Sequence, residues 1–156
     1  MKKLFLMAAA LFAAVSFSAC SEEDKVDVKT SIIGTWQITH DFGYQIVPGE
    51  GRFEYDTAYP IEDKNDEYGF YYTYTFNENG SGRYKSYYYY DPNAQGSDWT
   101  FEYTISNNQL SIYYEDDGTT ELYNIVEVTK DKLILLYTAD ERDGYKADLT
   151  YTYKRI

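Results

Sequence analysis

Alternation of apolar and polar residues runs through most of the chain and predicts strands. The alternating runs are bounded by Gly, Asn and Asp, which is the pattern of half-buried strands joined by turns. We predict about eight strands, at Ile33–His40, Tyr68–Phe76, Gly82–Tyr90, Trp99–Ile105, Leu110–Glu115, Thr119–Val128, Leu133–Ala139 and Tyr145–Arg155. No segment beyond residue 19 shows helical periodicity with caps, so the predicted class is all-β.

The connections between these strands alternate between tight and long. The tight connections lie at residues 77–80, 106–108 and 129–131. The others lie at residues 41–67, 91–98, 116–118 and 140–144, and most of them are longer. In an up-and-down antiparallel barrel, alternate connections lie at the same end. The sequence therefore predicts a barrel with a closed end of short turns and an open end of longer loops.

Charged residues at alternate positions show which side chains face the lumen. Arg83 and Lys85 must face water, so the alternate residues of their strand point inward. The strand 119–128 changes phase after Ile125, and a bulge near Glu127 would reconcile its two halves. Applied to the other strands, the same argument predicts a lumen rich in aromatic residues, including Tyr72, Tyr74, Tyr84, Tyr88, Tyr90, Trp99, Phe101, Tyr114, Tyr137 and Tyr151.

The first residues have the composition of a secretory leader. Two lysines, an apolar run over residues 4–15 and small residues up to Cys20 form its three parts, and the run is shorter than the ~20 residues of a membrane span. The end of this leader, Ser18-Ala19-Cys20, resembles the lipobox of bacterial lipoproteins. The resemblance implies a signal peptide over 1–19 and an acylated Cys20, with palmitate among the expected acyl groups. The alternative is an unmodified cysteine beside a cleavage site.

The segment after Cys20 is acidic. Ser21–Asp24 resembles the short export signal that sends some lipoproteins of Gram-negative bacteria to the outer face of the outer membrane. The alternative is a solvated acidic linker. Either way, residues 20–31 form a polar tether, and we expect the folded domain to span residues 32–156. The expected location is the outer membrane, with a lipid anchor and exposure at the cell surface.

Net charge and cysteine content exclude some classes of partner and some kinds of covalent or metal site. Without the two lysines of residues 1–19, 12 of the 14 basic residues remain against 26 acidic residues, which gives a net charge of −14. Nucleic acid is excluded as a partner, because its affinity comes mainly from neutralised phosphates. Cys20 is the only cysteine, so disulfides and cysteine-based metal clusters are excluded. We expect one domain, a monomer and no cofactor.

Motifs at the two ends of the predicted barrel carry a family resemblance. Gly34-Thr35-Trp36 matches the Gly-x-Trp of the first lipocalin strand, and Arg155 ends the last strand, where that family places a basic residue across the Trp. Tyr74–Phe76 and Tyr123–Thr129 also resemble the bacterial subgroup. The chain thus resembles a bacterial lipocalin-like domain. The resemblance implies an eight-stranded calycin-type barrel, closed by Gly34, Trp36 and Arg155, that binds a ligand without catalysis.

The open end carries the candidate ligand site. Inward tyrosines offer a flat apolar ring with a hydroxyl, which suits sugars, heteroaromatics or peptides. The acidic loops at this end repel anions, so we expect a small neutral or cationic ligand. The alternative is a lumen filled by these rings, with loops or outward tyrosines contacting a protein or a glycan. The predicted ligand-binding residues are His40, Tyr72, Tyr88, Tyr90, Trp99, Phe101, Tyr114 and Tyr137.

Other motifs are weaker. His40 has no Ser or Cys nucleophile signature around it, so no catalytic triad is expected. Residues 91–96 with Glu102 have the spacing of a calcium loop, but flanking strands favour a plain turn, and we predict no metal site. Asp116-Asp117 is most simply a solvated loop pair. Asp56-Thr57-Ala58, in the long first loop, resembles a bacterial O-glycosylation site at Thr57, and such a short pattern also arises by chance.

Overall fold

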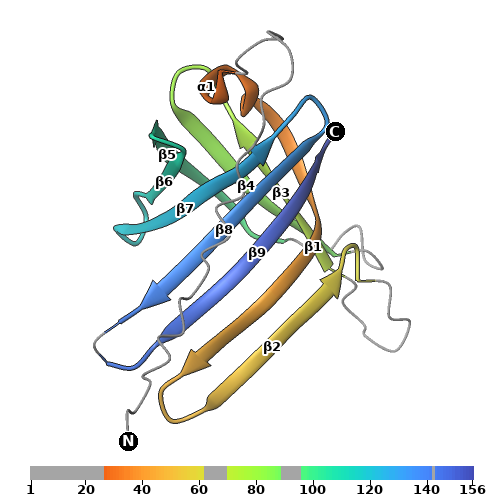
Figure 1. Ribbon diagram of the computed structural model, residues 1–156. Helices are drawn as coiled ribbons and strands as arrows, with labels where there is room; N and C mark the ends of the chain where they lie inside the picture. Colours follow the sequence, from red (N-terminus) through yellow and green to blue (C-terminus); the bar gives the residue numbers. More distant parts are fainter. Residues whose placement is uncertain (1–26, 62–69, 89–95, 142) are drawn as a thin grey trace, which may run out of the picture.

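The computed structural model describes residues 27–61, 70–88, 96–141 and 143–156. A single-turn helix, α1 (Val28–Ser31), is followed by antiparallel strands (Figure 1). Their bounds are β1 (Gly34–Val47), β2 (Gly51–Ala58), β3 (Phe70–Phe76), β4 (Ser81–Tyr88), β5 (Asp98–Ser106), β6 (Gln109–Tyr114), β7 (Thr119–Val128), β8 (Lys132–Asp140) and β9 (Lys146–Arg155). The predicted all-β class is confirmed.

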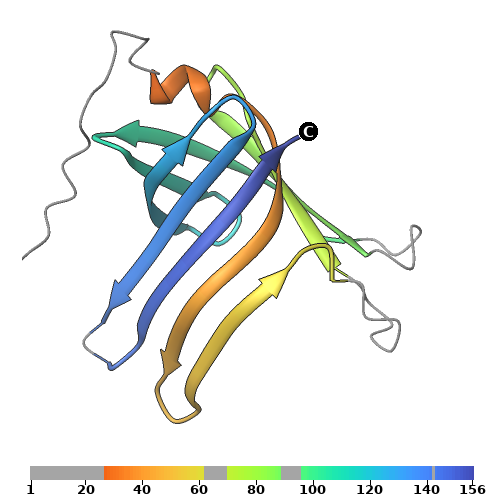
Figure 2. The same ribbon diagram turned by 45° about the vertical axis from the view of Figure 1, so that its right-hand side comes forward.

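The strands close into a barrel. Their order is β2-β1-β3-β4-β5-β6-β7-β8-β9, and β1 also pairs with β9. β3 pairs with residues 34–37 of β1, whereas β2 pairs with residues 40–47 of the same strand. Figure 2 shows β2 beside the far half of β1. Because β2 and β3 share one strand position, the barrel is the predicted eight-stranded antiparallel one.

The first connection is not the long loop that the sequence predicted. β1 continues to Val47, turns at residues 48–50, and pairs with β2 up to Ala58. A bulge explains why alternation hid this hairpin, since the β1–β9 register shifts between Ile38 and His40. The bulge predicted near Glu127 is confirmed, because the β7–β8 register shifts between Ile125 and Glu127.

The core fills the end of the barrel near α1. Its largest fully buried side chains include Trp36, Ile38, Phe76, Leu133 and Tyr153. They come from strands that are distant in sequence, so this cluster ties the two ends of the sheet together. Among the described residues, no helix has the length and apolar composition needed to cross a membrane.

The structure brings Gly34, Trp36 and Arg155 together at this closed end. The Trp36 indole N–H donates to the Ile32 carbonyl at 2.7 Å. The Arg155 guanidinium lies 4.3 Å from the centre of the Trp36 ring. Gly34 has φ +132°, which L side chains rarely adopt, and a Cβ there would lie 2.5 Å from Arg155 Nη1, so any other residue would be strained at this position. The same guanidinium donates at 2.6 Å to the carbonyls of Ser31, Ile33 and Lys130.

Candidate functional site

A cavity of about 490 Å³ lies inside the barrel at its open end. Its volume is within the range of roughly 300–1,000 Å³ that is typical of small-molecule sites. The lumen is therefore filled near Trp36 and hollow at the other end. Aromatic rings make most of the wall, from Tyr72, Tyr74, Tyr84, Trp99, Tyr114, Tyr123 and Tyr151, and the remaining lining residues are Asp116, Asp117, Thr119 and Glu121.

A stacked pair of rings stands at the mouth of this cavity. Tyr84 of β4 lies directly opposite Trp99 of β5 in the strand register, and their ring centres are 5.3 Å apart in a stacked arrangement. Trp99 also meets Tyr114 edge-on, with 6.3 Å between ring centres. Trp99 is 49% exposed, although it is on the inward face. A ligand that enters the cavity would therefore contact this ring.

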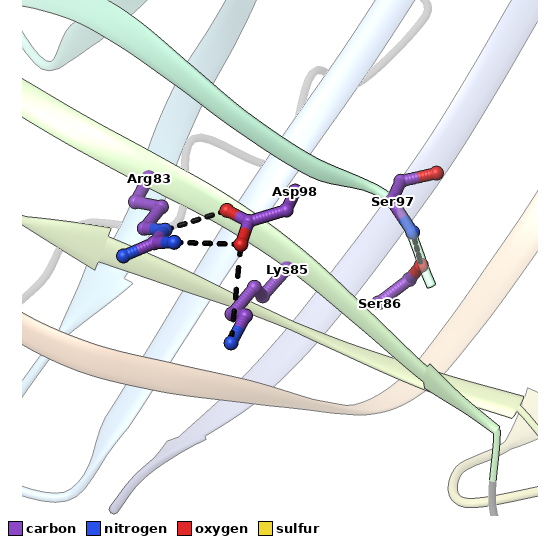
Figure 3. Close-up of polar contacts among 5 residues, drawn as sticks. All are labelled: Arg83, Lys85, Ser86, Ser97 and Asp98. Carbon is purple, nitrogen blue, oxygen red and sulfur yellow. Dashed lines mark hydrogen bonds and ion pairs between the residues drawn. The ribbon is translucent and has the colours of Figure 1, made fainter. Parts of the chain in front are cut away.

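Polar contacts on both faces of the sheet hold this part of the wall. Arg83 donates from Nε and Nη2 to the two carboxylate oxygens of Asp98, at 2.5 and 2.6 Å, and Lys85 lies 3.9 Å from the same carboxylate (Figure 3). The Ser97 N–H donates to Ser86 Oγ at 2.7 Å. Exposed ion pairs stabilise little, but these contacts fix the β4–β5 register. They therefore keep Tyr84 and Trp99 opposite each other at the mouth of the cavity.

One carboxylate lies among the rings. Glu121 of β7 accepts a hydrogen bond from the Tyr123 hydroxyl at 2.9 Å and a longer one from the Tyr114 hydroxyl at 3.4 Å, both at Oε2. The Tyr74 and Tyr114 hydroxyls are 3.2 Å apart, which continues the chain of hydroxyls. Burial raises the pKa of Glu121, since the apolar wall disfavours its charge. In the part of the chain that the structure describes, no Lys, Arg or His forms an ion pair with it.

The tyrosines of the cavity are neutral at physiological pH. Burial raises the pKa of Tyr72, Tyr74 and Tyr123 well above the ordinary value. Their hydroxyls therefore donate and accept hydrogen bonds without adding charge. Among the described residues, the charges on the cavity wall are those of the carboxylates Asp116, Asp117 and Glu121, and no basic residue belongs to the lining. The site is aromatic and anionic.

Three of the predicted ligand residues, Tyr72, Trp99 and Tyr114, line the cavity. Phe101 lies deeper, 3% exposed, with its ring edge-on to Tyr114 at 5.8 Å. Tyr137 lies against Tyr123, with ring centres 5.8 Å apart, and is not part of the lining.

Two further predicted residues belong to β4 and the segment after it. Tyr88 ends β4 opposite Phe70, and it also lies outside the lining. Tyr90 falls outside the described residues.

The predicted inward placement of His40 is wrong. Ile38 faces the core, but the bulge at Thr39 reverses the alternation, so Asp41 is buried at 7% exposure and His40 lies on the outer face. His40 bonds to Asp56 at 2.8 Å through Nε2 and stacks against the exposed Phe42, with 6.4 Å between ring centres. It is not part of the cavity lining.

The premise for glycosylation at Thr57 is also wrong, because this residue lies in a strand and not in a loop. Its backbone N–H donates to the buried carboxylate of Asp41 at 3.1 Å. Cys20 lies outside the described residues, as does most of the calcium-like loop at 91–96. Within the ranges described, no group of three or more His, Cys, Asp or Glu side chains could hold a metal ion.

Sequence reasoning missed the carboxylate at the centre of the site. Alternation placed Tyr74, Tyr84 and Tyr151 inward without assigning them to ligand binding. Glu121 was missed because the phase of strand 119–128 was ambiguous. The signal that could have found it is its spacing, since Glu121 is in phase with the buried Tyr123 and Ile125.

Comparison with known families identifies the fold. A family model described as a lipocalin-like domain matches residues 32–135. The chain belongs to the lipocalin-like domain family. Proteins with the lipocalin fold typically bind ligands and are not typically catalysts. The comparison with curated proteins gives no significant match.

Solved structures that are similar to this lipocalin-like chain have low sequence identity to it. A lipocalin-like protein from Bacteroides uniformis is 11% identical, with a TM-score of 0.47, and the alignment covers 81% of this chain and 99% of that one. A bovine odorant binding protein, in complex with a selenium-containing odorant, is 14% identical, with a TM-score of 0.45 and coverage of 88% and 78%.

Proposed function

We propose that this chain is a non-catalytic binding protein that holds a small neutral or cationic organic molecule in the cavity at the open end of its barrel. The observation that carries the proposal is the cavity itself, about 490 Å³ in volume and walled by seven aromatic rings. Rings with hydroxyls offer apolar area and hydrogen bonds at the same time. The described lining holds three carboxylates and no basic residue, which favours a ligand that is not an anion.

Native mass spectrometry of the protein purified from its source tests this function. We expect a small molecule to be retained non-covalently by the wild-type protein. Thr119→Trp places an indole at the cavity wall and should release it. Thr120→Trp is the matched control, because Thr120 is exposed and points to the opposite face. If the wild-type protein carries no small molecule, or if both variants retain it equally, the proposed function is wrong.

We also propose that Cys20 anchors the protein to the outer membrane through a lipid, with the barrel at the cell surface. The lipobox-like Ser18-Ala19-Cys20 and the acidic residues after it support this. Cys20→Ala should release the protein from the membrane fraction or leave the leader uncleaved. A cleaved Cys20→Ala protein that stays in the membrane fraction would contradict the anchor.

The surface location has a separate test. Replacing Glu22, Glu23 and Asp24 together by neutral residues should preserve acylation. The protein should then lose its accessibility to protease added outside the cell. Unchanged access would show that the acidic segment is only a linker.

The second candidate is an interaction lipoprotein that contacts a protein or a glycan through its outer surface. Apolar side chains on the outside of β6 and β7 favour it, because Tyr113, Leu122 and Val126 are 40%, 48% and 60% exposed. Exposed apolar groups that cluster in this way often mark contact sites. This candidate would gain from a wild-type protein that carries no small molecule.

A further inference from the structure

Glu121 places a carboxylate in the cavity wall at a position where the folded barrel does not require a charge. Its neighbours on the inward face of the sheet are Ile112, directly opposite on β6, and Tyr123, two residues on. A glutamine would have the same shape and would accept the same hydroxyl hydrogen bonds. The fold itself therefore does not require the negative charge.

The tyrosine hydroxyls next to Glu121 donate their hydrogen bonds to only one of its two carboxylate oxygens. Tyr123 and Tyr114 both donate to Oε2, and Tyr74 can in turn donate to Tyr114. Since each hydroxyl has one proton to give, this direction uses all three donors. Among the described residues, neither hydrogen bond goes to Oε1, which leaves that oxygen able to accept from a donor in the cavity.

The aromatic residues of the lining suit the uncharged part of a cationic ligand. Trp99, Tyr84 and Tyr114 meet at the mouth, with the stacked and edge-on contacts described above. Faces of Trp and Tyr rings attract organic cations and also stack on flat apolar groups. Asp116 and Asp117 add negative charge at the entrance and are exposed, so salt screens their effect. The cavity thus offers one half-buried charge and several rings.

We infer that the ligand of this cavity is an organic amine, whose ammonium group donates to Oε1 of Glu121 while its flat or apolar body lies against Trp99 and Tyr84. The inference rests on the proposed function and specifies the chemical class of the ligand. A buried carboxylate without a cationic partner is unfavourable, and an ammonium group beside it would offset that cost.

Three matched probes separate charge from ring stacking, namely 2-phenylethylamine, 2-phenylethanol and 3-phenylpropionate. They share a phenyl ring on a short chain and carry a positive, a neutral and a negative end group. Binding is measured by titration calorimetry and by Trp fluorescence, with Trp99 as the exposed reporter and Trp36 fully buried. We expect the amine to bind about 10-fold or more tightly than the alcohol, as a charge-assisted hydrogen bond would give, and the anion to bind most weakly.

Glu121→Gln keeps the shape and removes the charge. It should weaken the amine about 10-fold or more and change the affinity for the alcohol less than about twofold. Asp117→Asn is the control for the acidic entrance, and its smaller effect should vanish in high salt, whereas the effect of Glu121→Gln should persist. Circular dichroism spectra of both variants check that the barrel is intact.

The outcomes distinguish this inference from the function on which it rests. If the alcohol binds wild type as tightly as the amine, or if Glu121→Gln leaves amine affinity unchanged, the amine inference is overturned and the binding function stands. If none of the three probes binds, the inference is overturned. If the protein from its source also carries no small molecule, the binding function falls with it.

Discussion

Replacing Trp36 by alanine tests the closed end of the barrel. The side chain is fully buried, at 0% exposure, and packs where β1 meets β3 and β9. Truncating a buried Trp costs about 3–5 kcal/mol, including the cavity that it leaves. The Arg155 guanidinium also loses the ring below it. For a domain of this size, 1 kcal/mol shifts the melting temperature by roughly 3–5 °C, so we expect a fall of roughly 10–20 °C.

Trp99→Ala is the matched control for this experiment. It makes the same substitution at a side chain that is 49% exposed, where a stacked contact with Tyr84 and an edge-on contact with Tyr114 are lost. The two contacts together contribute roughly 1–3 kcal/mol, so the melting temperature should fall less than in Trp36→Ala. Thermal melts followed by circular dichroism compare the two variants. If Trp36→Ala melts within two degrees of wild type, or no lower than Trp99→Ala, the assigned role of Trp36 is wrong.

Three smaller predictions concern stability. Gly82→Ala should lower the urea midpoint, because its Cβ would lie 2.1 Å from the Phe101 ring and 2.7 Å from the Thr75 carbonyl oxygen; an unchanged midpoint would contradict this. Glu121→Gln should raise the melting temperature at neutral pH. Because the folded state raises the pKa of Glu121, the gain should disappear as pH falls toward the ordinary carboxyl value, and a pH-independent gain would refute this. Arg83→Ala should leave the urea midpoint nearly unchanged, since its ion pair is exposed, and a large shift would contradict this.

Much of the barrel could be predicted from the sequence because alternation is a local signal. Charged Arg83 and Lys85 fix the inward face of β4, and the short turns at 77–80 and 129–131 fix which ends of the strands meet. The bulge in β7 was predictable for the same reason, since Tyr123 and Val128 cannot both face inward without an extra residue.

The hairpin of β1 and β2 could not be predicted, because a bulge leaves no distinctive residue in the sequence. Thr39 shifts the phase, so His40 and Phe42 face outward and Asp41 faces inward. Read without the bulge, the same residues appear to be a polar loop. The misplacement of His40 follows from this single residue, and ending the first strand at His40 left Thr57 in an apparent loop.

The position and size of the cavity depend on which rings reach across the lumen, and strand periodicity carries no information about side-chain reach. Phe101 and Tyr114 both face inward, yet the first is buried in the core and the second lines the cavity. The hydrogen bonds of Glu121 could not be predicted for the same reason, since they depend on the reach of Tyr114 on β6 and of Tyr123 on its own strand β7.

β2 and β3 pair with different parts of β1, and this arrangement determines where related barrels can differ in length. β3 holds its register through residues 34–37 of β1, and β2 holds its own through residues 40–47. The length of the segment between them can therefore change without moving either register. Loop closure grows only slowly with length, by about 0.6 kcal/mol for each doubling. Tyr59 and Ile61 still donate backbone hydrogen bonds to Thr39 and Phe70. Insertions after Ile61 thus offer a route by which related chains acquire new specificity, or by which a foreign peptide is grafted, while the Trp36 end keeps the barrel folded.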